Sequence, residues 1–473
     1  MRYFPFISDV TVSTLSHDNP RDDQSTRTAD ELIVLIDCDR PTTGSIRCRL
    51  DDVNEVVIGR GSRRQVERAG HRLLIKLPDG RVSTSHATIT AEGDAFILQD
   101  VGSKNGIVVN GARAARHILR DGDVFECGRT FLRYRAACQR PATEPLDLEY
   151  ADGTQLANGL YTFHEPLARQ LRRLDEIARS ALPVLISGAS GTGKELVARA
   201  IHALSQRRGP FVGVNCGALA ENLVEAELFG ARRGAFTGAT EERTGLVRFS
   251  HEGTLFLDEV GELPLRAQPT LLRVLQEQEV LAIGATRPVH VDLRVVTATH
   301  RNLDLLTQNN QFRADLLARI VGVTIQLPRL RDRLDDVGII VSALLTREVG
   351  AGRPTPTITV AAMRQLLRYA WPLNVRELDH ALRAALTLSP ERIDVEHLPA
   401  AVCAAGSAPV AAAASQPQRK WTPEQQARRD EVEALLIAHH GNISQVARVM
   451  GKDRVQIRRW IKMFDIAIDH LVG

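Results

Sequence analysis

A glycine-rich stretch between an apolar run and a helical pattern constrains the fold of this chain more than any other feature. Val184-Leu-Ile186 precedes it, and apolar residues from Leu196 to Ile201 follow it at helical spacing. A strand, a glycine turn and a helix in this order predict a phosphate-binding loop, because backbone N–H groups at a helix N-terminus can surround phosphates. The residues expected to bind a nucleotide here are Gly188, Ala189, Ser190, Gly191, Thr192, Gly193, Lys194 and Glu195.

A second stretch gives this loop a chemical partner. Residues 251–259 have the pattern of a buried strand that ends in Asp258 and Glu259. The first acid of such a pair can hold Mg²⁺ and the second can polarise a water, while Lys194 supplies a point charge for the outer phosphates. Glu195 stands where Ser or Thr would normally help to hold magnesium, so the loop alone could be a plain glycine turn. The order and spacing of both stretches together predict a nucleotide hydrolase.

Between these two stretches lies a loop that resembles a known family. Glu227-Leu-Phe-Gly-Ala-Arg-Arg-Gly234-Ala-Phe-Thr-Gly-Ala239 is similar to the signature loop of the bacterial enhancer-binding proteins, the AAA+ ATPases that activate sigma-54 RNA polymerase. The resemblance covers residues 155–400 and implies ATP and Mg²⁺ as cofactors and a ring-forming homo-oligomer, from dimer to hexamer. It also implies contact with the sigma-54 holoenzyme through Gly234, Ala235, Phe236, Thr237, Gly238 and Ala239. Glycines at the tip should leave Phe236 exposed, the alternative being a Phe packed into the core.

The same resemblance assigns further residues of the ATPase. Asn215 would restrain Glu259 until the nucleotide state changes, His300 would sense the γ-phosphate at a position where many relatives carry Asn, and Arg376 would reach back to the phosphates. Arg313 and Arg319 have no obvious acid partner in the sequence and would act on the nucleotide of a neighbouring subunit. Surface salt bridges are the alternative for these two arginines. The catalytic set is therefore Glu259, Asp258, Lys194, Arg313, Arg319 and Asn215.

Length and composition limit the number of domains, the location of the protein and the chemistry of its cysteines. A chain of 473 residues with 44% hydrophobic and 25% charged residues predicts two to four globular domains. The sequence has no apolar run of eighteen residues and no signal-peptide pattern at its N-terminus, so we expect a cytoplasmic protein without membrane contact. Its six cysteines lack paired ligand spacing, which favours free thiols over zinc or disulfides. A formal charge of +3 means that DNA binding must be local.

Residues 31–140 show short apolar runs separated by turn dipeptides such as Asp79-Gly80 and Asn110-Gly111, which predict an antiparallel β-sandwich. Their loops resemble those of a forkhead-associated (FHA) domain, a reader of phosphothreonine. The residues assigned to the phosphothreonine ligand are Arg60, Ser83, Thr84 and Asn105, with His86 bracing the loops. The long basic segment between Arg60 and Ser83 either strengthens anion binding or is a solvated loop. A sandwich used only for packing or dimerisation is the alternative.

The C-terminal residues predict a DNA-binding module. Gly441 to Gly451 and Lys452 to Met463 show a helix, a tight glycine turn and a second helix, similar to the Fis-type helix-turn-helix of the family. Six basic residues and one acid lie between Gly441 and Phe464, although a solvated basic helix pair remains possible. The residues assigned to a palindromic enhancer site are Lys452, Arg454, Gln456, Arg458, Arg459 and Lys462.

The expected fold class is therefore multidomain: an all-β FHA sandwich, an α/β AAA+ P-loop ATPase with a helical lid, and an all-α helix-turn-helix. The expected parts are a tail at 1–30, the FHA domain at 31–140, a linker at 141–154, the ATPase subdomain at 155–328, the lid at 329–400, an Ala/Pro/Ser linker at 401–420 and the DNA-binding domain at 421–473.

The expected function is ATP-driven remodelling of the sigma-54 closed complex, regulated by phosphothreonine recognition. The ligand would be a protein phosphorylated by a Ser/Thr kinase, or this chain's own tail through Thr11, Thr14, Thr26 or Thr28. Two alternatives remain: a phosphopeptide-binding scaffold whose ATPase gates assembly, and a DNA-binding repressor that acts without sigma-54.

Overall fold

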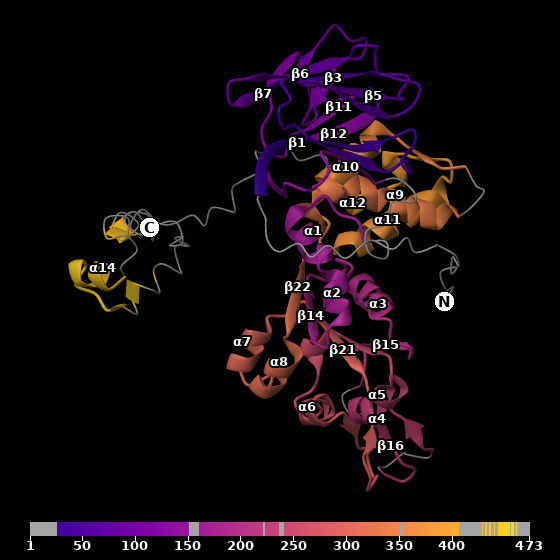
Figure 1. Cartoon of the computed structure of the whole chain (residues 1–473), viewed down its shortest axis with the longest axis vertical. Coiled ribbons are helices and arrows are strands. Elements are labelled where there is room, and N and C mark those ends of the chain that lie inside the picture. The colour runs from indigo at the N-terminus through magenta and orange to yellow at the C-terminus, as the bar shows by residue number, and fades with distance from the viewer. Residues whose placement is uncertain are drawn as a thin grey trace. The chain divides into compact units, whose positions relative to one another are not determined.

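The structure is a computed structural model, and its residues fall into two compact units, 1–407 and 408–473. In the first unit it describes residues 26–150, 160–220, 223–235, 241–350 and 354–405. In the second it describes residues 428, 431–432, 435–436, 439, 443–454, 456–457 and 460. The first unit carries the sandwich, the nucleotide-binding sheet and the lid (Figure 1).

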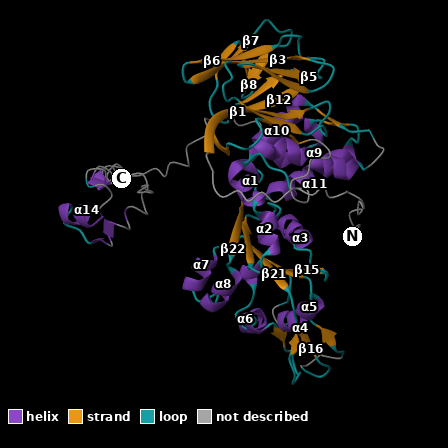
Figure 2. Ribbon diagram, viewed as in Figure 1, coloured by secondary structure: helices purple, strands orange, loops and turns teal. Residues whose placement is uncertain are grey.

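The N-terminal part of the first unit is a sandwich of two sheets (Figure 2). One sheet has the order β13 (Asp147–Tyr150), β2 (Ser45–Arg49), β1 (Thr26–Asp37), β12 (Thr130–Pro141), β11 (Val124–Cys127), β8 (Ile107–Val109) and β9 (Ala112–Ala114). The other has the order β10 (Arg116–Ile118), β7 (Ala95–Asp100), β6 (Ala87–Glu92), β3 (Glu55–Arg60), β5 (Arg72–Leu77) and β4 (Gln65–Ala69). The pair β3–β5 is parallel, unlike the all-antiparallel pairing expected from the sequence.

The strand bounds differ from the expected boundaries at both ends of the sandwich. β1 begins at Thr26 and pairs there with Pro141, so residues 26–30 of the expected tail are part of a sheet. β13 pairs with β2 inside the expected linker 141–154. Residues 26–30 of β1 and most of β13 are polar, and both segments pair with strands far away along the chain. Short-range periodicity carries no information about such pairs.

A five-stranded parallel sheet forms the ATPase core, in the order β15 (Phe211–Asn215), β18 (Thr254–Asp258), β21 (Arg294–Thr299), β14 (Val184–Gly188) and β22 (Val323–Leu327). Its helices are α1 (Glu165–Arg172), α2 (Leu174–Arg179), α3 (Lys194–Leu204), α4 (Val224–Phe229), α5 (Leu246–Phe249), α6 (Gln268–Glu277), α7 (Leu303–Gln308) and α8 (Ala314–Ile320). Two small ribbons pair β16 (Gly230–Ala231) with β17 (Arg243–Thr244) and β19 (Glu279–Val280) with β20 (Val289–His290). The strands β14, β18 and β21 are neighbours, so the residues that follow them meet at one edge of the sheet.

The lid contains α9 (Val337–Val349), α10 (Val360–Arg368), α11 (Asn374–Leu388), α12 (Ala400–Ala405) and the parallel pair β23 (Thr357–Ile358) and β24 (Arg392–Ile393). Trp371 fills its centre and donates a hydrogen bond of 2.8 Å to the carbonyl of Leu366.

The sandwich and the lid share one hydrophobic core. Alternate residues of β1 point to opposite faces: Leu32 and Val34 enter the sandwich core, whereas Ile33 and Leu35 pack with buried lid residues. The backbone N–H of Ile358 in β23 donates a 2.8 Å hydrogen bond to the carbonyl of Cys38. A fully buried apolar side chain contributes about 1.5–3 kcal/mol. The sandwich is therefore docked on the lid and is not tethered to it by a linker alone.

In the second unit, α14 (Ile443–Val449) is followed by Gly451, which has a φ of +61°. Val432, Leu436, Val446, Ala447 and Ile457 form a small buried cluster there. No helix among the residues described is both long and apolar enough to pass through a membrane.

Candidate functional site

The glycine-rich loop leaves β14 and enters α3, as the sequence predicts. Gly191 and Gly193 have φ values of +77° and +105°, in a backbone region that residues with a Cβ rarely adopt. The ammonium of Lys194 is buried and donates to the carbonyl of Gly188 at 3.0 Å. The carboxylate of Glu195 forms an ion pair of 2.6 Å with Arg199 on the same helix. Glu195 thus has a local partner.

Glu259 lies at the centre of the candidate catalytic cluster. Lys194 Nζ is 3.1 Å from Glu259 Oε1, and His300 Nδ1 is 2.6 Å from Glu259 Oε2. Burial opposes ionisation, but the hydrogen bonds from His300 and Lys194 lower the pKa of Glu259 below its ordinary value. An ionised carboxylate is the state required of a general base. His300, expected as a phosphate sensor, therefore bonds directly to the proposed base.

Asp258 ends β18 beside Asn215 of β15 in the strand register. The chemistry of one carboxylate suits Mg²⁺, which is usually bound by one or two carboxylates together with nucleotide phosphates and waters. Among the described residues there is no cluster of three or more His, Cys, Asp or Glu side chains that could hold a metal without phosphate. Asp258 fits a magnesium that arrives with a nucleotide.

Two expectations for this site differ from the structure. The side-chain oxygen of Asn215 accepts a 3.0 Å hydrogen bond from the N–H of Gly217, and the oxygens of Glu259 are held by Lys194 and His300 instead. Arg313 was expected to lack an acid partner, but it pairs with Asp315 at 2.6 Å. Asp315 lies two positions after Arg313, and a search for acids three or four positions away, as on one face of a helix, does not find it.

Arg319 donates to the carbonyl of Leu275 at 3.1 Å and is exposed. Both candidate arginine fingers are thus held by their own chain through exposed contacts. The contact of Arg313 is an exposed ion pair, a kind that contributes only about 0–1 kcal/mol, and that of Arg319 is a hydrogen bond to a backbone carbonyl.

The lid contacts the phosphate loop through Arg333, which precedes α9 in the sequence, and through two residues of α11. Arg376 Nη1 donates to Ser190 Oγ at 3.0 Å, which brings the predicted residue to the loop. Asn374 Nδ2 donates to the carbonyl of Ser190 at 2.9 Å, and buried Arg333 donates to the carbonyl of Thr192 at 2.9 Å. Sequence reasoning missed Asn374 and Arg333, because nothing in their local pattern marks a contact to a loop more than 140 residues away.

An apolar cavity of about 350 Å³ adjoins the loop and was also missed. Its walls come from α1 and the segment before it, from the glycine-rich loop, from α3 and from the lid. Among its lining residues are Leu160, Tyr161, Leu167, Leu171, Thr192, Gly193, Leu196, Val197, Ile339, Ile340, Leu344 and Val375. An apolar cavity beside the glycine-rich loop suits a nucleobase.

The three loops expected to bind phosphothreonine converge. The carbonyl of Ser83 accepts from the N–H of Arg60 at 2.9 Å, and Ser83 Oγ accepts from the N–H of Lys104 at 3.1 Å. Buried His86 bonds to the N–H of Ser83 and lies 3.1 Å from the carbonyl of Gly106, so it braces two loops. The loops are therefore joined by hydrogen bonds at their bases.

The side chains at this end of the sandwich face solvent. Arg60, Thr84 and Asn105 are exposed, and the side chain of Arg60 forms no hydrogen bond or ion pair with any residue that the structure describes. An unpaired guanidinium beside short donors suits a phosphate dianion.

The basic segment between Arg60 and Ser83 is largely accounted for by internal pairs. It forms β4 and β5, and Arg64, Arg68 and Arg72 pair with Glu149, Asp147 and Glu55 at 2.7, 2.6 and 2.9 Å. Of the two interpretations left open by the sequence, neither a solvated loop nor a basic patch for anions describes these three arginines. They secure strand edges of the sandwich.

Several predicted residues lie outside the described part of the chain: Phe236, Thr237, Gly238, Ala239, Arg458, Arg459 and Lys462, together with Thr11 and Thr14. Gly234 and Ala235 are described at the start of their loop. Lys452, Arg454 and Gln456 lie after the Gly451 turn, the first two of them exposed, and the N–H of Gln456 donates to the carbonyl of Asp453 at 3.0 Å.

The fold and the site define a P-loop ATPase of the AAA+ class with a lid and an N-terminal β-sandwich. Three family models match: a sigma-54 interaction domain at residues 160–326, an FHA domain at 56–128 and an AAA+ ATPase lid domain at 331–415. The predicted fold class is thereby confirmed for the sandwich, the ATPase core and the lid.

Curated relatives agree. The DNA-binding transcriptional regulator NtrC of Azospirillum brasilense is 40% identical over 357 residues, which cover 69% of this chain and 73% of that protein. The nitric oxide reductase transcription regulator NorR1 of Cupriavidus necator is 41% identical over 318 residues, covering 63% of this chain and 62% of the relative. The chain belongs to the sigma-54-dependent transcriptional activators, and it carries an FHA domain.

A solved structure of NtrX from Brucella abortus in complex with ADP is 31% identical, covers 65% of this chain and 70% of that one, and superimposes with a TM-score of 0.49.

Proposed function

We propose that the chain binds enhancer DNA through its C-terminal unit and uses ATP hydrolysis to remodel the closed complex of sigma-54 polymerase, under the control of a phosphothreonine ligand. The contact of Glu259 with both Lys194 and His300 is the observation that best supports hydrolysis, since it places a carboxylate base beside the phosphate-binding lysine. In this scheme Asp258 holds Mg²⁺, and Arg313 and Arg319 act on the nucleotide of an adjacent subunit.

The mechanism needs three steps from the chain's own residues. Arg376 and the loop from Gly188 to Glu195 bind the phosphates, and the apolar cavity binds the nucleobase. Glu259 then removes a proton from the attacking water. The magnesium ion, when bound, neutralises phosphate charge. Hydrolysis then moves the loop that carries Phe236 against the polymerase.

In vitro transcription from a sigma-54 promoter, with purified polymerase and with or without ATP, tests this function. The wild-type chain should form open complexes only with ATP, whereas Phe236→Ala should hydrolyse ATP and fail to activate. Activation by Phe236→Ala would remove the loop from the mechanism. ATPase activity without any effect on the polymerase would favour the phosphopeptide-binding scaffold.

DNA binding is proposed for Lys452, Arg454, Gln456, Arg458, Arg459 and Lys462, as a dimer on a palindromic site. The exposed position of Arg454 after the Gly451 turn supports this, because base edges are contacted from the start of a recognition helix. Arg454→Ala in the full chain should weaken binding to an enhancer fragment, and the affinity of the wild-type chain should fall steeply with salt. Binding that does not depend on salt would argue against this module.

The input is proposed to be a phosphothreonine peptide held by Arg60, Ser83, Thr84 and Asn105. Such a peptide would come from a partner protein modified by a Ser/Thr kinase, or from this chain's own tail. The convergence of the three loops on Ser83 supports this assignment. Calorimetry with phosphorylated and unmodified forms of the same peptide tests it, and equal affinity for both forms would leave the sandwich as a packing module.

A further inference from the structure

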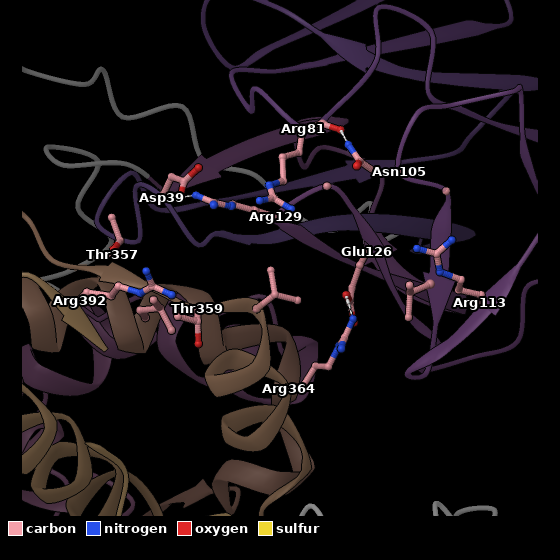
Figure 3. Close-up of a pocket in the computed structure, with 15 residues that line it drawn as sticks. Asp39, Arg81, Asn105, Arg113, Glu126, Arg129, Thr357, Thr359, Arg364 and Arg392 are labelled. Atoms are coloured by element: carbon pink, nitrogen blue, oxygen red, sulfur yellow. Dashed lines mark hydrogen bonds and ion pairs between the residues drawn. The ribbon is translucent and has the colours of Figure 1, made fainter. Parts of the chain in front are cut away.

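A polar cavity of about 410 Å³ lies between the loop end of the sandwich and the lid. Figure 3 shows Arg81, Asn105 and Arg129 on the sandwich side, and Thr357, Thr359 and Arg392 on the lid side. Asn105 belongs both to this cavity and to the proposed phosphothreonine site. A peptide held at Asn105 can therefore extend directly into the space that the lid closes.

The charges of the cavity favour an anion. Five arginines and two carboxylates line it: Arg81, Arg113, Arg129, Arg364 and Arg392 with Asp39 and Glu126. Both carboxylates are already neutralised, since Asp39 pairs with Arg129, and Glu126 accepts two hydrogen bonds of 2.6 Å from Arg364.

Three guanidinium groups remain for a ligand. The side chains of Arg81 and Arg113 form no hydrogen bond or ion pair with the described residues, and Arg392 has only a 3.3 Å contact with its neighbour Asp394. Arg392 is 66% exposed. Guanidinium groups prefer carboxylates and phosphates, which they can bind through two parallel hydrogen bonds.

The two walls are held in place by the core that the sandwich and the lid share. β23 is bonded to Cys38 through Ile358, and Arg364 is bonded to Glu126, so Thr357 and Arg392 are kept opposite the sandwich loops. A ligand in this cavity thus touches two parts of the chain at once.

We propose that the lid forms one wall of the peptide site, and that the cavity binds a carboxylate side chain that flanks the phosphothreonine, with Arg392 as its partner on the lid. The ligand class is an acidic phosphothreonine peptide. This inference rests on the proposed phosphothreonine recognition. It goes further, because it makes the lid a direct contact of the ligand. The same lid also holds the phosphate loop through Asn374 and Arg376.

Binding is measured with the full-length chain and a degenerate library of phosphothreonine peptides, in which each flanking position is Asp in one pool and Asn in the other. The best peptide pair is then titrated by calorimetry. Two further peptides cover residues 5–25 with phosphate on Thr11 or Thr14, and these distinguish the chain's own tail from an external partner.

The key variant is Arg392→Ala, with Arg383→Ala as a matched control on the lid, because Arg383 is exposed and does not line the cavity. Arg392→Ala should weaken binding of the Asp peptide by up to about fivefold and leave the Asn peptide unchanged, as expected for the loss of an ion pair with an exposed arginine. Arg81→Ala should act in the same direction, and Arg383→Ala should bind both peptides as the wild type does. An unchanged thermal midpoint for Arg392→Ala verifies the fold.

The outcomes separate the two claims. If Arg60→Ala abolishes phosphopeptide binding but Arg392→Ala and Arg81→Ala bind both peptides like the wild type, the cavity is not part of the site and phosphothreonine recognition stands. If no phosphothreonine peptide binds better than its unmodified form, recognition itself fails and the inference fails with it.

Discussion

Arg333 donates a 2.9 Å hydrogen bond to the carbonyl of Thr192, which joins the lid to the phosphate loop. Its neighbours in sequence make two other long-range contacts. Asp335 pairs with Arg133 and Arg135 of β12 in the sandwich, and Asp336 accepts from Thr162 ahead of α1 at 2.6 Å. Three residues within the four-residue segment 333–336 thus join the lid to the phosphate loop, to the sandwich and to the segment before the ATPase core.

The first prediction concerns Arg333. Its replacement by Ala removes the donor from the Thr192 carbonyl, and a hydrogen bond to a charged group contributes about 1.5–3 kcal/mol. Arg333→Ala should therefore bind ATP at least about tenfold more weakly. Arg331→Ala is the control, because Arg331 is exposed and its ion pair among the described residues is with the adjacent Asp332. Equal KM and kcat values for Arg333→Ala and the wild type would contradict a role at the loop.

The second prediction concerns hydrolysis. Glu259→Gln should keep nucleotide affinity, since Lys194 still binds phosphate, but turnover should fall at least about a hundredfold, as expected when a general base is lost. Nucleotide binding by fluorescence and steady-state ATPase assays measure the two effects separately. Turnover near the wild-type rate would show that another group activates the water.

The third prediction concerns docking. A Cβ on Gly338 would lie 1.7 Å from the carbonyl oxygen of Leu35, so Gly338→Ala cannot fit unless α9 and β1 separate. Alanine favours a helix over glycine by about 1 kcal/mol, so any loss of stability must come from the lost docking. Hydrogen exchange should rise in β1 and α9 and remain low in β6. Gly80→Ala is the control, because a Cβ there has no neighbour within 4 Å. Equal protection of β1 and α9 in Gly338→Ala and in Gly80→Ala would mean that this close approach does not hold the sandwich.

The fourth prediction concerns pH. Burial raises the pKa of Asp336 to about 6, against the opposing effects of Arg333 and the hydrogen bonds from Thr162 and Phe163. Because this pKa lies above the unfolded value of 3.8, the folded chain takes up the proton first as the pH falls.

Relative to Asp336→Asn, the wild type should therefore gain about 2 kcal/mol of stability between pH 7 and pH 4.5. The difference between the urea unfolding free energies of the two proteins measures this gain. A difference that does not vary with pH would mean that Asp336 keeps an ordinary pKa in the folded chain.

Local sequence determined the parts whose chemistry depends on neighbours along the chain. The loop from Gly188 to Glu195 folds at the end of β14 because its own glycines allow the backbone to turn. Asp258 and Glu259 lie at the end of β18, which is separated from β14 by β21 in the same sheet. The turn dipeptides of the sandwich likewise fixed where its loops lie along the chain, whereas the convergence of those loops on Ser83 depends on the packing of the two sheets.

Only the tertiary structure decided which distant groups meet. The contacts of Arg333 with Thr192, of His300 with Glu259 and of Arg364 with Glu126 join residues 141, 41 and 238 positions apart. Both faces of β1 carry apolar residues, so its sequence does not show which face packs in the sandwich and which packs on the lid. The periodicity of apolar residues predicts that a face of a strand is buried. Which element covers that face depends on how the whole chain packs.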